Sequence, residues 1–243
     1  MKSKIVVGNW KMNGDMSSVS SFARDIVGEH QVELALAVPA TLITPAVLCM
    51  PEILIGAQDV ASTSDGPFTG SISAAMMREA GASFTIVGHS ERRIGLGDDD
   101  AKVKAKVRAA LQVGLRVLLC VGDRSNSGSP TENNKIVNDQ LLRCLPDLSL
   151  PSALMVAYEP VSAIGTGVTS SINEIEDVLD TLRESVRSRI GDDVSEIRFL
   201  YGGSVNASNA REISGISGLD GLLVGRSSLS VPEFLRVASA ASS

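Results

Sequence analysis

The chain has 243 residues, of which 44% are hydrophobic and 21% are charged. This balance is typical of a globular protein with a sizeable core and excludes an intrinsically disordered chain. The net charge is −6, and the basic residues are spread along the chain, which argues against a nucleic-acid-binding protein. Length alone leaves one large domain and two small domains both open.

The cysteines and the lengths of the apolar runs indicate the cellular compartment in which the protein is expected. Cys49, Cys120 and Cys144 are odd in number and widely spaced, which fits neither a disulfide framework nor a CxxC metal pair. The first residues become polar too early for a signal peptide, and no apolar run reaches the length of a membrane span. We therefore expect a cytoplasmic protein in a reducing compartment, without membrane association.

Short apolar runs of strand character recur along the chain, with helix-like segments between them, as is typical of βαβ units and a parallel sheet. The runs are Ile5–Val7, Leu34–Val38, Ile53–Ala57, Phe84–Val87, Val117–Val121, Leu154–Tyr158, Ile197–Tyr201 and Gly221–Val224. No composition shift divides the chain, and closing the sheet removes its edges. We predict an α/β protein, a single (β/α)₈ TIM barrel over residues 1–243. An open doubly wound sheet is the alternative, but no GxGxxG follows the first run.

Two intervening segments carry clear helix signals. In Ser171–Ile190 apolar residues recur three or four apart, Ser170 or Ser171 can cap the start, and Gly191 can end the helix. Asp98–Val113 repeats the pattern, with three acidic residues at its start. The segment Ser125–Asn134, rich in Ser, Asn, Gly and Pro, is interpreted as an exposed loop.

Chemically active side chains follow the first, fourth and sixth runs. In a barrel, catalytic groups lie at the C-terminal ends of strands, which is where Asn9, Lys11, His89 and Glu159 occur. Taken alone, each of three residues also has a non-catalytic interpretation. Lys11 could be a solvated surface group, His89 could be hydrogen-bonded within its loop, and Glu159 could form an ion pair with a Lys or Arg at the rim. A helix beginning at Ser90 would offer N–H groups to His89 and favour a neutral imidazole, whereas His30 lies on the opposite rim and is expected at the surface.

The loops after the sixth, seventh and eighth runs are rich in glycine. The sequence Tyr201-Gly-Gly-Ser204 and the pair Gly225-Arg226 can present backbone N–H groups to a phosphate. Val161–Val168 has the composition of a mobile lid beside Glu159. No metal site is expected, because the two histidines are distant and the carboxylates are not clustered. A base, a proton shuttle, a cation and a phosphate cradle on one rim are what 1,2-enolisation of a phosphorylated hydroxy-carbonyl requires.

The motifs Asn-Trp-Lys, Gly-His-Ser-Glu-Arg-Arg, Tyr-Glu-Pro-Val, Ala-Ile-Gly-Thr-Gly and Tyr-Gly-Gly-Ser-Val occur here in the order found in a known family. The chain resembles the triosephosphate isomerases over its whole length. That resemblance implies a cofactor-free aldose–ketose isomerase of glycolysis and gluconeogenesis, which interconverts dihydroxyacetone phosphate and D-glyceraldehyde 3-phosphate. The roles it implies are Glu159 as base, His89 as proton shuttle, Lys11 as cation, Asn9 as a pocket residue, and Gly165, Ser204, Gly225 and Arg226 as phosphate-binding residues through their backbone N–H groups.

The resemblance also implies a homodimer. Members of the family insert the loop after the third strand into a pocket of the partner subunit near the positions of Asn9 and His89. The segment Asp65–Ile72 matches this loop, with Thr69 at its tip.

Four positions depart from the family pattern. Ser162 and Asp123 replace a Trp and a Glu that meet when the lid closes, Asp98 replaces a Glu, and Arg226 replaces the second Gly of the last phosphate loop. Two alternatives therefore stay open. One is a paralogue that isomerises a four-carbon ketose phosphate, and the other is a phosphate-ligand binding protein with impaired lid closure.

Overall fold

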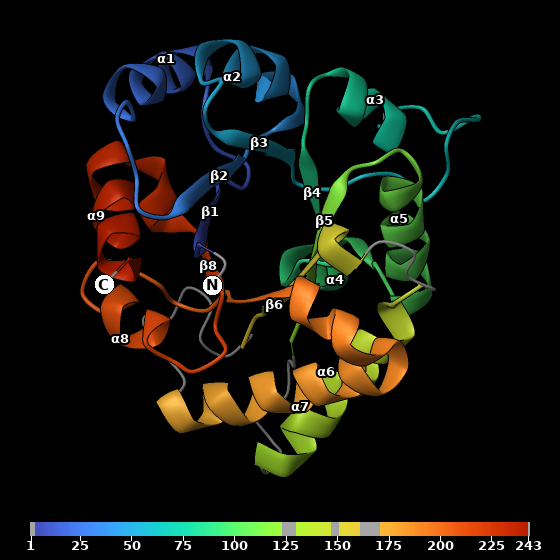
Figure 1. The fold of residues 1–243 in the computed structure, drawn as a ribbon. Coiled ribbons are helices and arrows are strands. Elements are labelled where there is room, and N and C mark those ends of the chain that lie inside the picture. The colour runs from blue at the N-terminus through green and yellow to red at the C-terminus, as the bar shows by residue number, and fades with distance from the viewer. Residues whose placement is uncertain (1–2, 123–129, 147–150, 161–170, 243) are drawn as a thin grey trace.

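Eight parallel strands close into a barrel in the order β1 to β8, and helices surround it in the computed structural model (Figure 1). The structure describes residues 3–122, 130–146, 151–160 and 171–242. The strands are β1 (Ile5–Asn9), β2 (Glu33–Ala37), β3 (Leu54–Ala57), β4 (Phe84–Val87), β5 (Arg116–Val121), β6 (Leu154–Tyr158), β7 (Arg198–Tyr201) and β8 (Gly221–Val224). Each strand pairs with the next, and β1 pairs with β8. The predicted (β/α)₈ barrel is confirmed, with each strand close to its expected bounds.

The connections between strands contain helices and short 3₁₀ turns. The α-helices are α1 (Met16–Asp25), α2 (Ile43–Cys49), α3 (Ala74–Glu79), α4 (Ser90–Leu96), α5 (Asp100–Gln112), α6 (Pro130–Cys144), α7 (Ile172–Ile190), α8 (Ala210–Ser214) and α9 (Val231–Ala241). The 3₁₀ turns are η1 (Ala40–Leu42), η2 (Pro151–Ala153), η4 (Gly191–Glu196) and η5 (Arg226–Leu229). None of these described helices has the length and apolar character needed to cross a membrane.

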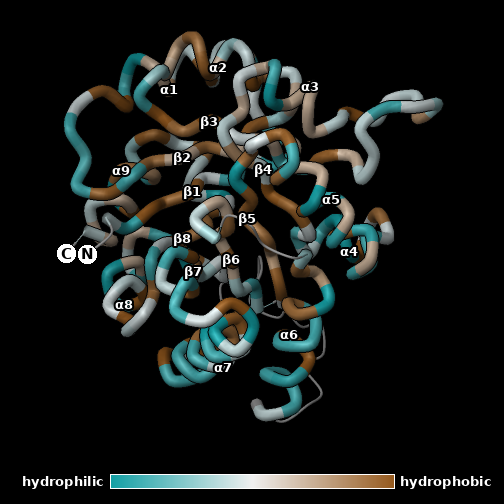
Figure 2. The backbone as a smooth tube through the Cα atoms, turned by 45° about the vertical axis from the view of Figure 1, so that its right-hand side comes forward, coloured by the Kyte–Doolittle hydropathy of each residue, from teal (hydrophilic) through white to brown (hydrophobic). Residues whose placement is uncertain are grey.

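Two apolar layers hold the barrel together. Strand residues alternate, so that Ile5 and Val7 point into the barrel with Phe84 and Ile86, while Val6 joins the layer between strands and helices. The outer helices α6 and α7 present largely hydrophilic residues in the hydropathy view (Figure 2). A filled interior means that the barrel is a core and not a channel, so ligands are restricted to its ends.

Helix α7 matches its sequence signals closely. The Ser171 side chain accepts a hydrogen bond from the Glu174 N–H, and the Glu174 carboxylate accepts one from the Ser171 N–H. The helix ends at Gly191, whose φ of 68° lies in the left-handed region that glycine adopts without steric cost. Its apolar stripe, Ile175, Val178, Leu179, Leu182 and Val186, is buried.

Three sequence-based expectations need correction. Residues 130–134 belong to α6 and not to a loop, because Pro130 occupies the first turn of that helix, where proline is well tolerated. The rest of the expected loop lies outside the described residues. Helix α5 begins at Asp100 with Asp99 as its cap, so Asp98 is not part of its acidic first turn. His30 is half-buried, with Nε2 3.0 Å from the Ile26 carbonyl oxygen, and does not lie fully at the surface.

Candidate active site

The described candidate residues meet at the C-terminal end of the barrel. A cavity of about 660 Å³ opens there, and its lining includes Asn9, Lys11, His89, Glu159, Ser204, Gly225 and Arg226. Gly165 falls outside the described residues, as do Ser162 and Asp123. A cavity of similar volume, about 650 Å³, lies by α1, α2 and the starts of β2 and β3, but no Lys or Arg is among its lining residues. The first cavity is therefore the better site for an anionic ligand.

The carboxylate of Glu159 is buried at the bottom of this cavity. The residue is 2% exposed, its Oε1 lies 3.0 Å from His89 Nε2, and its Oε2 accepts a hydrogen bond of 3.0 Å from the Ser90 N–H. Burial alone would raise the pKa of this carboxyl, but the charge and hydrogen bond of His89, the Ser90 N–H and Lys11 outweigh it and hold the pKa below its usual value. Glu159 is therefore ionised in this arrangement.

Glycines make room for the Glu159 segment. A Cβ on Gly122 would lie 1.8 Å from the Glu159 carbonyl oxygen, and a Cβ on Gly202 would lie 3.0 Å from the Glu159 Cγ. Only glycine at position 122 permits this approach of the chain after β5 to the chain after β6.

His89 caps helix α4, as the sequence suggested. Its Nδ1 accepts a hydrogen bond of 3.3 Å from the Glu91 N–H, so the ring proton lies on Nε2, facing Glu159. Burial lowers the pKa of His89, but the charge of Glu159 and its hydrogen bond act in the opposite direction, and the pKa is raised overall. The sequence predicted the contact of His89 with the helix. It did not predict that Glu159 raises the pKa of His89, because Glu159 follows a strand that is distant in sequence.

Lys11 has a strained backbone. Its φ of 53° makes it the one non-glycine residue with a positive φ in the described chain. The Asn9 Oδ1 accepts a hydrogen bond of 2.9 Å from the Lys11 N–H, and the Gln58 side chain donates one of 2.8 Å to the Lys11 carbonyl oxygen. The Lys11 ammonium lies 2.6 Å from the Glu91 carboxylate. These contacts direct the side chain into the cavity.

The loops after β7 and β8 form the remaining wall. A Cβ on Gly203 would lie 2.2 Å from the Tyr201 hydroxyl oxygen, so this turn requires glycine. Ser228 donates both its N–H, at 2.9 Å, and its hydroxyl, at 2.7 Å, to the Gly225 carbonyl oxygen. Across the described residues, the N–H groups of Ser204, Gly225 and Arg226 have no protein acceptor. They are free to donate to an anion in the cavity.

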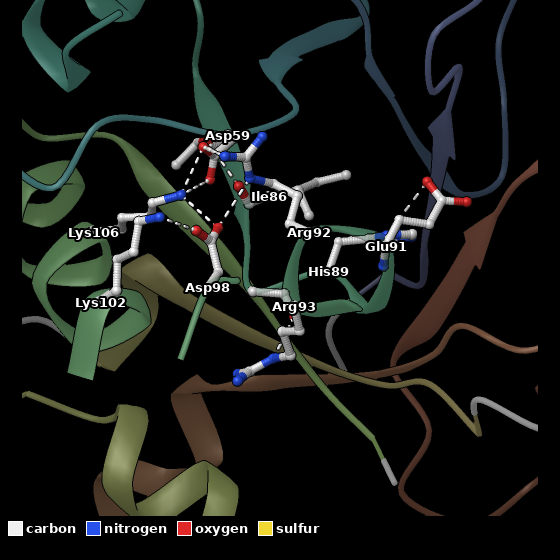
Figure 3. Close-up of polar contacts among 11 residues, drawn as sticks. Asp59, Ile86, His89, Glu91, Arg92, Arg93, Asp98, Lys102 and Lys106 are labelled. Atoms are coloured by element: carbon white, nitrogen blue, oxygen red, sulfur yellow. Dashed lines mark hydrogen bonds and ion pairs between the residues drawn. The ribbon is translucent and has the colours of Figure 1, made fainter. Parts of the chain in front are cut away.

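A cluster of ion pairs holds α4, the helix that carries His89. The buried carboxylate of Asp98 contacts Arg92 at 3.0 Å, Lys102 at 2.7 Å and Lys106 at 2.6 Å, and Figure 3 shows the three cations converging on it. Asp59, after β3, contacts Arg92 at 2.9 Å and Lys106 at 2.8 Å. Burial would raise the pKa of Asp98, but the three cations lower it to about 2. Asp98, one of the four residues that depart from the family pattern, therefore lies at the centre of this cluster.

The model of the triosephosphate isomerase family matches residues 4–241 of this chain. The chain belongs to the triosephosphate isomerase family. The triosephosphate isomerase of Ruegeria pomeroyi is 42% identical over 246 residues, covering 99% of this chain and 98% of its own. That of Afipia carboxidovorans is 40% identical, covering 97% and 96%. The crystal structure of triosephosphate isomerase from Bartonella henselae has a TM-score of 0.90 at 36% identity, covering 98% and 99%.

This membership confirms the predicted family and enzyme class, since triosephosphate isomerases are aldose–ketose isomerases of glycolysis. Sequence analysis missed Gln58 and the partner roles of Ser90 and Glu91. Gln58 directly follows β3, so the same rule that selected residues at strand ends would have found it. Ser90 acts through its backbone N–H, a contact that residue type does not reveal.

The ion cluster around Asp98 depends most on its buried lysine. Lys106→Met leaves Asp59 and Asp98 without their most buried cation and should lower the free energy of unfolding by about 3–5 kcal/mol. Lys102→Met, one turn earlier on α5 and 43% exposed, should lower it by less than about 1 kcal/mol. Urea denaturation at one protein concentration measures both. Equal losses would contradict the assignment of Lys106 as the central cation.

The charge of Glu159 controls the pKa of His89. Glu159→Gln removes the negative charge but keeps the burial, so it should lower the pKa of His89 in an NMR titration. His30, at the other end of the barrel, provides the internal reference signal. An unchanged or higher pKa would contradict the pairing.

The same pair predicts a pH dependence of stability. The raised pKa of His89 stabilises the fold below about 6.5, and this contribution is lost as pH rises through the folded-state value. The lowered pKa of Glu159 stabilises it above about 4.3, a contribution lost as pH falls through the folded-state value. The stability difference between wild type and Glu159→Gln should therefore be greatest between these limits.

Proposed function

We propose that this protein interconverts dihydroxyacetone phosphate and D-glyceraldehyde 3-phosphate through an enediol or enediolate. The observation that carries the proposal is the contact of 3.0 Å between the Glu159 carboxylate and His89 Nε2, in a cavity that Lys11 and two glycine-rich loops also line. This set supplies a base, a donor to oxygen, a cation and N–H groups for a phosphate. We propose residues 1–243 as one catalytic domain that acts in the cytoplasm.

Each residue has a distinct role in this reaction. Glu159 removes the proton from one carbon and returns it to the neighbouring carbon. His89 donates its Nε2 proton to the substrate oxygen on which negative charge develops, and Lys11 stabilises that charge. Asn9 keeps Lys11 in its strained conformation. The N–H groups of Ser204, Gly225 and Arg226 hold the phosphate, together with Gly165, which lies outside the described residues.

Turnover of triose and tetrose phosphates by wild type and Glu159→Asp tests the proposal. The shorter side chain withdraws the carboxylate from the carbon, so we expect kcat on the triose phosphates to fall by at least about 10²-fold with a smaller change in KM. Equal activity of the two proteins would remove Glu159 as the base. A preference of wild type for the tetrose phosphate would support the four-carbon paralogue, and phosphate binding without turnover would support the binding protein.

We further propose a homodimer through the loop that carries Thr69. This segment projects from the barrel between β3 and α3 (Figures 1 and 2). Phe68 beside Thr69 is 52% exposed, and Met12, Met76, Ile94 and Leu96 are also exposed. An apolar contact with a second chain would remove Phe68, at the end of the projecting segment, from water.

Light scattering tests the dimer. Wild type at micromolar concentration should have the mass of two chains, and Phe68→Asp should shift it towards one, because the change places a charge in an apolar contact. Ile136→Asp, on α6 and 43% exposed, is the matched control and should leave the mass unchanged. A wild-type monomer would contradict the proposal.

A further inference from the structure

Lys11 and Arg226, the Lys and Arg residues among the described lining of the candidate site, differ in their pairing. Lys11 lies 2.6 Å from Glu91, so much of its charge is compensated within the protein. Arg226 is exposed, lines the same cavity, and has no carboxylate within ion-pair distance in the described part of the chain. Among the described lining residues, Arg226 is therefore the Lys or Arg residue that has no carboxylate partner.

The backbone places Arg226 beside the predicted phosphate cradle. It begins η5, separated from β8 by Gly225 alone, and its N–H has no acceptor among the described residues. The Ser227 hydroxyl lies 3.4 Å from the Val205 carbonyl oxygen, which connects this turn to the loop after β7. A Cβ on Gly225 would lie 3.7 Å from Lys11 Cε, so the turn also lies against the lysine side chain. The side chain of Arg226 is thus added to a turn whose backbone already suits an anion.

A guanidinium at this position has a clear electrostatic effect. The chain carries a net charge of −6, which repels a dianion at long range. A guanidinium offers paired N–H donors whose geometry matches two phosphate oxygens, and its charge strengthens those hydrogen bonds. Arg226 would offset the repulsion at the point where the phosphate enters.

We propose that the Arg226 side chain is a phosphate ligand of this protein, additional to the backbone N–H groups, and that it increases affinity for dianionic phosphate esters. The inference deepens the proposed function and takes the identity of the substrate from it. The family pattern has glycine at this position, and glycine has no side chain that could make this contact.

The experiment compares wild type with Arg226→Ala, Arg226→Lys and Arg24→Ala. Arg24 has a side chain that is 71% exposed on α1 and pairs with Asp25, so its removal controls for net charge. Kinetics with dihydroxyacetone phosphate give kcat and KM, and calorimetry gives the Kd of inorganic phosphate, all at low ionic strength. For Arg226→Ala we expect KM and the phosphate Kd to rise about three- to tenfold with kcat little changed, and for Arg226→Lys a partial recovery. Arg24→Ala should match wild type.

Other outcomes would overturn the inference. Equal KM and phosphate Kd in wild type and Arg226→Ala would show that the guanidinium makes no contact, and a loss confined to kcat would indicate a structural role. An equal increase in KM and phosphate Kd in Arg24→Ala would show that the effect arises from net charge alone. If wild type lacks isomerase turnover but Arg226→Ala still weakens phosphate binding, the proposed function fails and the phosphate contact stands.

Discussion

The buried negative charge of Glu159 is the constraint on which the site depends. A carboxylate that is 2% exposed is stable only when donors replace the lost water, and His89 Nε2 and the Ser90 N–H do so here. The donors come from the N-cap residue and the first residue of α4, so the start of this helix must lie at the mouth of the barrel beside the end of β6. Closure of the sheet brings these two segments together although Ser90 and Glu159 are 69 residues apart.

The position of α4 depends in turn on the charges behind it. Arg92, on α4, shares Asp98 with Lys106 of α5, and Asp59 connects both cations to the end of β3. A buried ion cluster contributes little net stability relative to an apolar core, but its removal in part leaves unpaired charges. The cluster therefore fixes the orientation of α4 more than it stabilises the barrel, and the shorter Asp98 still reaches its three cations in this arrangement.

The sequence predicted the barrel, the strand positions and the rim on which the candidate residues lie, because apolar periodicity and strand ends are local properties. It did not predict what depends on neighbours across the barrel. Asp98 looked like an acidic residue at a helix start, yet its side chain pairs with cations from two helices, Arg92 of α4 and Lys102 and Lys106 of α5. The role of Gln58 depends on the carbonyl oxygen of Lys11, a residue 47 positions earlier whose backbone has a positive φ. The glycine at position 122 was likewise unremarked, since its requirement arises from β6.

The raised pKa of His89 in the structure is compatible with a neutral imidazole during the proposed reaction. The increase comes from the negative charge of Glu159, while burial acts in the opposite direction. When Glu159 takes the carbon-bound proton it loses that charge, and the cause of the increase disappears. Burial and the Glu91 N–H on Nδ1 then favour the neutral ring at the moment when Nε2 must donate its proton to the substrate oxygen. In the proposed reaction, the protonation of Glu159 therefore lowers the pKa of His89.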